Sequence, residues 1–363
     1  MPVYYEPLNV NTDRTTTRTV LHEIIPLTGT IVSGTYGTYR SEQNIKNYTH
    51  GMFQSVFDYP FLSSSANHIF DITMGYDESS FMSASHHTQN SKKINVYNQM
   101  SQVLLGYTGS SNVVRLFESD LKLDQTGSMR EVFFVNLSRL VIKDQIKKGS
   151  FSISLGTGSD GLPFDSSEAI SVLTLTDASA SEVGGTTNTL GGDFGVLHQK
   201  NADGTFGDGT PNGKGVIFYQ AGIAVLTASI WADSVLAAHD FQTDTNGSTY
   251  SVTASMITSS ISGNCDALRR RIQNISFNNS TEINSTIYFC RLPVNKFNYS
   301  SNPTYVSGSK IRVKNVASDL PVSYITTVGL YNARNELLAT AKLSEPLKKT
   351  PQNELTIRVR LDY

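Results

Sequence analysis

The chain closes with the segment Leu355-Thr356-Ile357-Arg358-Val359-Arg360-Leu361, in which large apolar residues alternate with polar ones. Successive side chains of a β-strand point to opposite faces, so this period of two predicts a strand with one apolar face. The other face carries two arginines, and charged side chains on an outer strand guard against unwanted pairing. The segment therefore predicts a half-buried strand whose polar face meets solvent or another subunit.

Working outward from this segment, the chain shows further β-strand patterns. Residues 324–331 and 337–343 predict two strands joined by the turn Asn332-Ala333-Arg334-Asn335. A turn at Gln220-Ala221-Gly222 separates two apolar runs that predict buried strands. The remaining expected strands cover residues 132–137, 151–155, 172–176, 216–220 and 223–229, with a hairpin formed by residues 272–278 and 286–292.

Helical spacing is limited to a few places. Apolar residues three to four positions apart over residues 94–104 predict a helix that stops at Gly106. A shorter helical pattern at residues 52–57 ends before Pro60, and residues 251–273 predict a helix broken at Gly263. Two short helical segments are expected at residues 143–148 and 231–239. These patterns favour a β-rich α+β fold of antiparallel sheets and β-sandwich modules with a few short helices.

Chain length and composition divide the sequence into regions. A chain of 363 residues exceeds the size of one hydrophobic core, so two or three domains are expected. We expect an extended N-terminal arm (1–43) or, equally, an edge strand with loops; a mixed helical and β region (44–130); a β-rich core (131–295); and a C-terminal β module (296–363). Residues 177–215 are rich in glycine and small polar residues, which predicts a long surface excursion within that core.

Charge and cysteine content exclude several function classes. Charged residues make up 17% of the chain, below the roughly 25% of an average soluble domain. The net charge of -2 gives no electrostatic footprint for nucleic acid. The two cysteines, Cys265 and Cys290, cannot form a disulfide-dense scaffold, and two free thiols are expected. We find no secretory signal and no membrane span, so synthesis in the cytoplasm is expected.

Motifs that resemble functional sites all have simpler interpretations. Gly156, Gly158 and Gly161 match a dinucleotide-binding spacing, but the residues after them do not open a long helix. The adjacent His86 and His87 point apart on a strand or helix, so a shared metal ion is not expected. The acidic loop at residues 203–209 lacks the alternating ligands of a calcium site. We therefore expect no catalytic, cofactor-binding or metal-binding residues, and no enzyme.

Aromatic residues leave one binding mode to weigh. Trp231 and the tyrosines Tyr36, Tyr39, Tyr48 and Tyr59 form a possible sugar platform. Aromatic side chains are equally expected in cores and subunit interfaces, which is the interpretation we favour.

Several segments resemble tail-fibre and baseplate proteins of tailed bacteriophages. The C-terminal unit at residues 325–332 and 335–342 resembles a strand–turn–strand module of those proteins, and the run Phe297-Asn298-Tyr299-Ser300 before it is similar. Residues 70–76, 92–100 and 147–151 resemble uncharacterised virion proteins of contractile-tailed, marine-type phages. The resemblance covers segments from about residue 68 to the end and implies particle assembly without catalytic residues.

The resemblance and the composition together predict a structural protein of the phage tail or baseplate. Its expected partners are other tail or baseplate proteins and copies of itself in a homo-oligomer, and its expected location is the virion. A receptor- or glycan-binding tail tip, with contact to the host surface, is the first alternative. A neck or collar protein and a depolymerase are the others; a depolymerase needs two carboxylates in one cleft.

Overall fold

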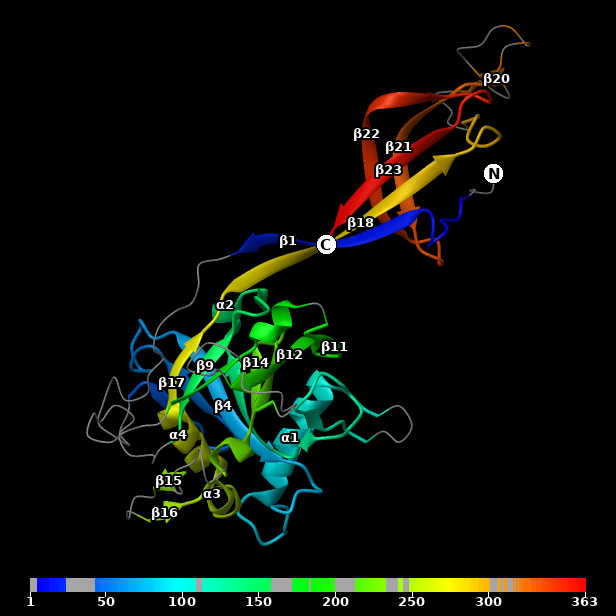
Figure 1. Ribbon diagram of the computed structural model, residues 1–363. Coiled ribbons are helices and arrows are strands. Elements are labelled where there is room, and N and C mark those ends of the chain that lie inside the picture. The colour runs from blue at the N-terminus through cyan, green and yellow to red at the C-terminus, as the bar shows by residue number, and fades with distance from the viewer. Residues whose placement is uncertain are drawn as a thin grey trace. The chain divides into compact units, whose positions relative to one another are not determined.

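The computed structural model describes residues 5–23, 43–108, 113–157, 172–182, 184–199, 213–232, 241–243, 248–300, 306–307, 310–311, 316, 318 and 320–363. Strand residues (43%) outnumber helix residues (17%), which confirms the β-rich α+β class. The chain forms two compact units (Figure 1). Unit 1 comprises Met1–Leu21 and Glu282–Tyr363, and unit 2 comprises His22–Thr281. The four consecutive regions expected from the sequence stay a prediction; the first strand, β1, lies largely in the unit that contains the last.

Unit 2 is built on one antiparallel sheet of eleven strands. Its strands, in pairing order, are β17 (Ile272–Ser276), β9 (Ser152–Gly156), β10 (Val172–Thr176), β12 (Gly192–Gln199), β13 (Gly215–Phe218), β14 (Ile223–Thr227), β7 (Glu131–Leu137), β4 (His68–Tyr76), β3 (Gln54–Phe57) and β2 (Ile45–Asn47), with β11 (Thr187–Thr189) beside β12. The central strands β13, β14 and β7 are nearly continuous apolar runs, as expected of strands covered on both faces.

Aromatic clusters fill both sides of the central strands. Phe133 and Phe134 are neighbours on β7, so their side chains point to opposite faces. The ring of Phe134 lies 5.6 Å from that of Phe117, while Phe133 lies 5.6 Å from Trp231 and 5.4 Å from Phe241. All five side chains are buried. The core therefore extends to both faces of the sheet.

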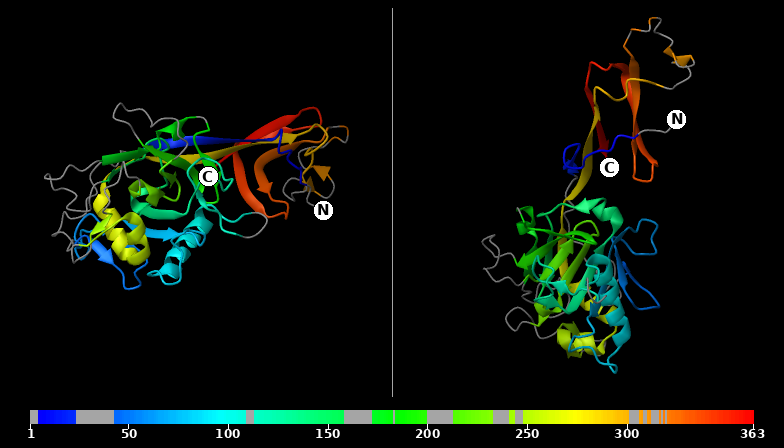
Figure 2. Two further views of the ribbon diagram at one scale, coloured as in Figure 1. Left: turned by 60° about the horizontal axis from the view of Figure 1, so that its bottom comes forward. Right: turned by 90° about the vertical axis from the view of Figure 1, so that its right-hand side faces the viewer.

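Four helices and several short strands complete the described part of unit 2. The helices are α1 (Asn90–Leu104), α2 (Arg139–Ile142), α3 (Val252–Thr258) and α4 (Ile261–Arg271), with 3-10 turns at Ala178–Ser181 and Ala228–Trp231. The short strands are β5 (Phe117–Glu118), β6 (Ser128–Met129), β8 (Gln145–Ile146), β15 (Gln242–Thr243) and β16 (Thr249–Tyr250). Both α1 and α4 pack against β4 (Figure 2).

Gly75 of β4 allows α1 to approach the sheet closely. A Cβ atom at this position would lie 2.6 Å from the backbone oxygen of Lys93 and 2.8 Å from the backbone nitrogen of Tyr97. Backbone atoms of a helix cannot move aside as a flexible side chain does. Gly75 therefore fixes the distance between α1 and the sheet.

We expect Gly75→Ala to lower the free energy of unfolding by about 2 kcal/mol, because overpacking forces the helix away from β4. Urea denaturation followed by circular dichroism measures this change. The control is Gly263→Ala in α4, where the nearest atom to a new Cβ is the flexible end of Gln242, at 3.0 Å. Alanine favours a helix, so this control is expected to be neutral or stabilising. Equal stabilities of the two variants would contradict the role of Gly75.

Unit 1 contains a three-stranded sheet and a long hairpin. The sheet has the order β1 (Arg14–Glu23), β18 (Asn279–Leu292), β23 (Leu355–Asp362), and β18 also pairs with β8 through its first residues. The hairpin consists of β21 (Ser323–Tyr331) and β22 (Leu337–Lys349), which curve together in Figure 1. A two-residue pair, β19 (Val306–Ser307) and β20 (Lys310–Ile311), is also present.

Many predicted elements are confirmed. Helix α1 ends as expected before Gly106, whose φ is +82°. The strands β7, β9, β10, β13, β14, β21, β22 and β23 lie where the apolar patterns place them. The N-terminal segment forms the edge strand β1, and the residues between 24 and 42 lie outside the described part of the chain. Cys265 and Cys290 are free thiols, as expected.

Two predicted helices are wrong. Residues 54–57, expected to be helical, form β3, which pairs with β4 in the sheet. The run is too short to hold a helix, whereas strand pairing satisfies its backbone. Residues 145–146, expected within a helical turn, form β8, and the helical turn lies earlier as α2. The expected helix at 231–239 falls mostly outside the described residues.

Three further expectations need correction. The helical segment at 252–271 breaks at Ser259–Ser260, because the Ser260 hydroxyl caps α4 by accepting a hydrogen bond from the Gly263 N–H at 3.1 Å. Strands β17 and β18 do not form a hairpin; β17 pairs with β9, and β18 with β1, β8 and β23. The region 177–215 is not only a surface excursion, because its strand β12 is largely buried within the large sheet.

Candidate functional site

The residues that raised metal or cofactor chemistry do not gather into a site. The rings of His86 and His87 lie 4.4 Å apart and edge to face, and Nδ1 of His87 lies 2.5 Å from the backbone oxygen of Met82. Over the described ranges, no group of three or more histidine, cysteine, aspartate or glutamate side chains is placed to hold a metal ion. Gly158, Gly161 and the acidic loop at 203–209 lie outside those ranges.

The aromatic residues considered for sugar binding are divided between core and surface. Trp231 is buried, and its ring nitrogen donates a hydrogen bond to the backbone oxygen of Gly156 at 3.2 Å. Its expected place in a core is therefore confirmed. Tyr48 stacks with His50 at a ring distance of 5.2 Å, and Tyr59 is exposed. Tyr36 and Tyr39 are outside the described residues.

Asp177 is a fully buried carboxylate in unit 2, and no sequence pattern singles it out. It accepts hydrogen bonds from the backbone N–H groups of Gly149 (2.9 Å) and Phe151 (2.8 Å) and from the Tyr219 hydroxyl (2.9 Å). Burial raises the pKa of Asp177, and these donors act against that rise. With both oxygens engaged by the protein, Asp177 holds the loop before β9 against Tyr219, the residue that follows β13.

Lys93 of α1 is a second buried ionisable group, with an exposed fraction of 0%. Its Nζ donates hydrogen bonds to the backbone oxygens of Met256 (2.6 Å) and Ser259 (2.9 Å), at the C-terminal end of α3. Burial lowers the pKa of Lys93 to about 8. A lysine with such a pKa is a possible nucleophile, but here the amine is enclosed and bound to carbonyl groups. Its arrangement joins α1 to α3.

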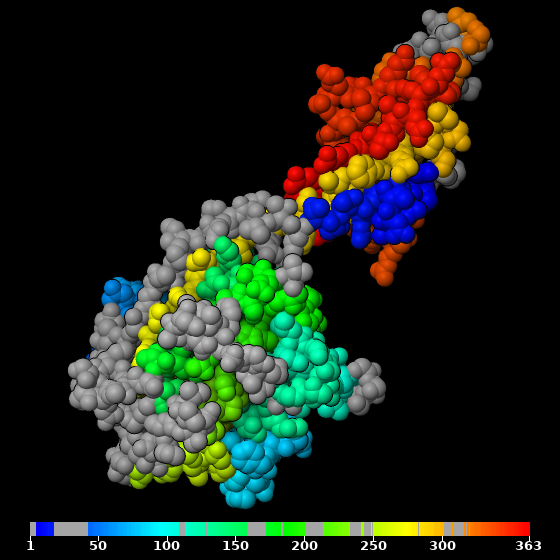
Figure 3. All heavy atoms as spheres, viewed as in Figure 1, coloured from blue at the N-terminus to red at the C-terminus, as the bar shows by residue number. Residues whose placement is uncertain are grey.

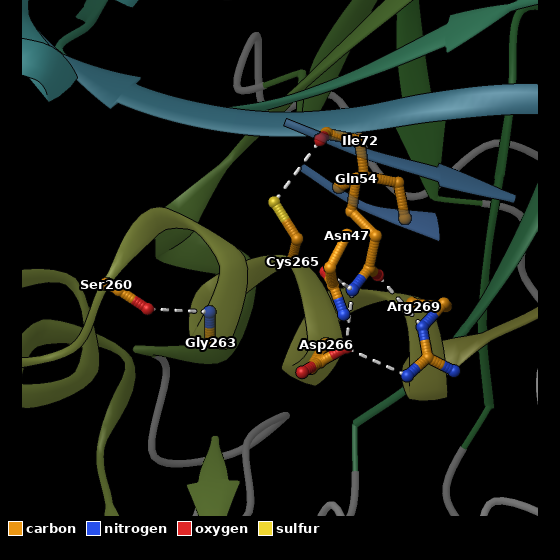
Figure 4. A network of polar contacts seen from close by, with 8 residues as sticks. All are labelled: Asn47, Gln54, Ile72, Ser260, Gly263, Cys265, Asp266 and Arg269. Atoms are coloured by element: carbon orange, nitrogen blue, oxygen red, sulfur yellow. Dashed lines mark hydrogen bonds and ion pairs between the residues drawn. The ribbon is translucent and has the colours of Figure 1, made fainter. Parts of the chain in front are cut away.

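A polar network connects α4 to strands β2 and β3 (Figure 4). Arg269 donates from Nε to Gln54 Oε1 at 3.0 Å and from a terminal nitrogen to Asp266 Oδ1 at 2.9 Å. Gln54 in turn donates from Nε2 to Asp266 Oδ1 at 2.7 Å and to Asn47 Oδ1 at 2.8 Å. Arg269 and the two arginines after it, Arg270 and Arg271, are all buried, and the network fixes α4 on the sheet.

Unit 1 differs from unit 2 in how little apolar surface it encloses. Its hydrophobic cluster has three buried members, Leu292, Ile357 and Val359, each still 5–7% exposed. The other members of the cluster are only partly buried: Tyr288, Cys290, Phe297, Ile325, Val328, Leu330, Ala341, Leu343, Leu355 and Leu361. The hydrophobic cluster of unit 2, in contrast, contains many side chains with no exposure at all. Among its described residues, the apolar face of unit 1 is thus only half covered.

The β21–β22 hairpin also presents large apolar side chains to solvent. Tyr324 and Leu337 are about half exposed, and Leu338 is 68% exposed. Both outer edges of this hairpin are without a partner strand in the described part of the chain. Figure 3 shows the side chains of β1, β18 and β23 lying against one another in the same unit. We define the candidate assembly surface as β21 and β22 together with the half-buried cluster beneath them.

Comparison with known proteins identifies no relative of this chain. No family model, no curated protein and no solved structure matches this chain. Among the helices of the described segments, none is both long and apolar enough to cross a membrane.

Proposed function

We propose that this chain is a structural protein of a tailed-phage virion, a tail or baseplate component that acts by binding copies of itself and other tail proteins. The observation that carries the proposal is the half-covered apolar cluster of unit 1. Its strand–turn–strand hairpin is also the segment that resembles tail-fibre and baseplate proteins. In this proposal unit 1 makes the contacts with other subunits, and unit 2 is a folded unit with a complete hydrophobic core of its own.

The energetics of burial support this division. Apolar surface removed from water contributes about 25 cal/mol per Å², so a cluster with three buried members gives unit 1 little stability of its own. A small unit with a thin core commonly gains the missing burial by association. Interfaces between permanently associated subunits are also more apolar than ordinary surface. A neighbouring subunit that covers the hairpin would bury the exposed apolar side chains of unit 1 and would form an apolar interface of this kind.

The chemistry of unit 2 supports a structural role. Two of its fully buried ionisable side chains, Lys93 and Asp177, are held by backbone groups and a tyrosine hydroxyl. Such bonds fix elements relative to one another, and they leave neither group facing solvent. We therefore propose no reaction for this protein.

The test is to purify virus particles by density gradient from the culture that produces the chain, and to follow the chain by quantitative mass spectrometry. The expected result is a fixed copy number per particle, retained when tails are separated from capsids. A soluble host protein of similar size serves as the control for carry-over. If the chain remains with the control in the unsedimented lysate, it is not a virion component and the proposal fails.

A further inference from the structure

In the described part of unit 1, the four outer edges formed by strands longer than two residues are not alike. Strands β1 and β23 border the three-stranded sheet, and β21 and β22 border the hairpin. Three of these strands contain charged residues, and β22 also contains Pro346. β21, with the sequence Ser-Tyr-Ile-Thr-Thr-Val-Gly-Leu-Tyr, has neither a charged residue nor a proline. Among the described strands of this unit that are longer than two residues, it is the one open edge without these features.

Charged residues and proline on an edge strand oppose pairing with another chain. On β23, Arg358 and Arg360 are exposed and alternate with the buried Ile357 and Val359. A second β23 laid against this strand would bring like charges together, which destabilises a cross-strand pair. On β22, Lys342, Glu345 and Lys348 are exposed, and Pro346 lacks the N–H needed for a ladder.

β21 has the opposite character. It is nine residues long, rich in β-branched and aromatic residues, and paired only with β22 in the described chain. Ile325, Val328 and Leu330 point into the half-buried cluster, and Tyr324 and Tyr331 are 50% and 43% exposed. A strand added at this edge would extend the same apolar layer over the exposed parts of that cluster.

We propose that β21 is the edge at which a second copy of this chain adds its own β21, antiparallel, to make one four-stranded sheet across a two-fold axis. The pairing is self-complementary, as a two-fold interface requires, because an uncharged strand meets itself without like-charge repulsion. It satisfies the outward backbone groups of both strands and doubles the apolar layer. This inference rests on the proposed assembly function and names its partner.

The test uses one substitution on β21 and a matched one on β22. Thr327 and Lys342 are cross-strand partners, as are Gly329 and Thr340, so Thr327 and Thr340 lie on the same face of the hairpin. Both threonines are exposed. Thr327→Glu places a carboxylate opposite Lys342, which preserves the hairpin, but brings two carboxylates close together across the two-fold axis. Thr340→Glu adds the same charge to the same face on the other strand.

Sedimentation equilibrium of the full-length chain is expected to show twice the monomer mass for the wild type and for Thr340→Glu. For Thr327→Glu we expect the dissociation constant to rise at least tenfold, about 1.4 kcal/mol, with an unchanged circular dichroism spectrum. A monomeric wild type at 100 µM protein, on the order of weak interfaces, would overturn the inference. So would a dissociation constant of Thr327→Glu equal to that of the wild type. An equal loss of affinity in Thr340→Glu would overturn it as well, because the dimer would then form through the exposed face of the hairpin and not through the β21 edge.

Disulfide trapping provides a second readout. In a Cys290→Ser background, cysteine is introduced singly at Thr326, Thr327 or Gly329 of β21 and at Thr340 of β22. Antiparallel strands place facing Cα atoms about 4.5–5.5 Å apart, within the range of a disulfide. Covalent dimers are expected from at least one β21 position and not from Thr340. Their absence from all three β21 positions would overturn the pairing of β21 with itself.

The two proposals fail in different ways. A chain that is present in particles but does not dimerise through β21 keeps the proposed function and loses this inference. A chain that dimerises through β21 but is absent from particles keeps the interface and loses the virion function.

Discussion

Asp177→Ala is expected to lower the free energy of unfolding by about 4 kcal/mol, which would make it one of the most damaging single substitutions in the chain. The substitution removes the acceptor for three donors, the N–H groups of Gly149 and Phe151 and the hydroxyl of Tyr219. Each buried donor left without a partner costs about 1–3 kcal/mol. Urea denaturation followed by tryptophan fluorescence measures the loss, because Trp231 is buried in the same unit.

Two further variants separate the lost hydrogen bonds from the lost side chain. Tyr219→Phe removes one donor and leaves both backbone N–H groups bound, so we expect a loss of about 1 kcal/mol. Asp177→Asn keeps the size but turns an amide group toward a donor, and its loss is expected between the other two. Glu345→Ala on an exposed part of β22 is the control, expected within about 0.5 kcal/mol of the wild type. Equal stability of Asp177→Ala and this control would contradict the buried role.

The local spacing of apolar residues was enough to predict the helices and strands whose structure depends mainly on their own residues. The clean alternation of Leu355–Asp362 and the turn between β13 and β14 both place strands correctly. Helix α1 follows from apolar residues at helical spacing, because a long amphipathic helix carries its pattern within one segment. In each case the signal and the structure it predicts lie within the same few residues.

The incorrect predictions fall where distant contacts decide the structure. Residues 54–57 have the spacing of a helical face, but their pairing with β4 makes them a strand. The glycines around β12 suggested a surface loop. In the structure Gly195 allows Tyr219 to approach, since a Cβ there would lie 2.1 Å from the tyrosine hydroxyl oxygen. Composition alone does not distinguish a glycine that packs closely from one in a flexible loop.

The candidate assembly surface was only partly readable in the sequence. The hairpin of β21 and β22 was predicted, and the absence of charge from β21 can be read directly. That β21 is an open edge beside a half-covered cluster depends on strand order, which the sequence does not contain. The burial of Asp177 and Lys93 also depends on partners far along the chain, at Tyr219 and Met256. No local pattern marks such contacts.

Lys93 is expected to give the protein a stability that increases with pH between about 8 and 10. Burial lowers the pKa of this lysine to about 8 from an ordinary value of 10.5. Between these values the unfolded chain keeps the proton on Lys93 while the folded chain releases it. A state that binds more protons is weakened as pH rises, so the unfolded state is disfavoured and the folded state gains stability.

The variant Lys93→Met isolates this contribution from those of other titrating groups. Between pH 7 and pH 10.5, the stability of the wild type relative to the variant is expected to rise by up to about 3 kcal/mol, the equivalent of the pKa difference. At pH 7 the variant loses two hydrogen bonds to Met256 and Ser259 but no longer buries a charge, so the two proteins are expected to differ little there.

Urea denaturation at intervals of half a pH unit measures the difference between the two proteins. The matched control for removal of a lysine side chain from this helix is Lys92→Met, at the adjacent and exposed position. A constant difference for Lys93→Met would mean that the folded protein titrates Lys93 like an exposed lysine. The buried amine would then not be the group that joins α1 to α3.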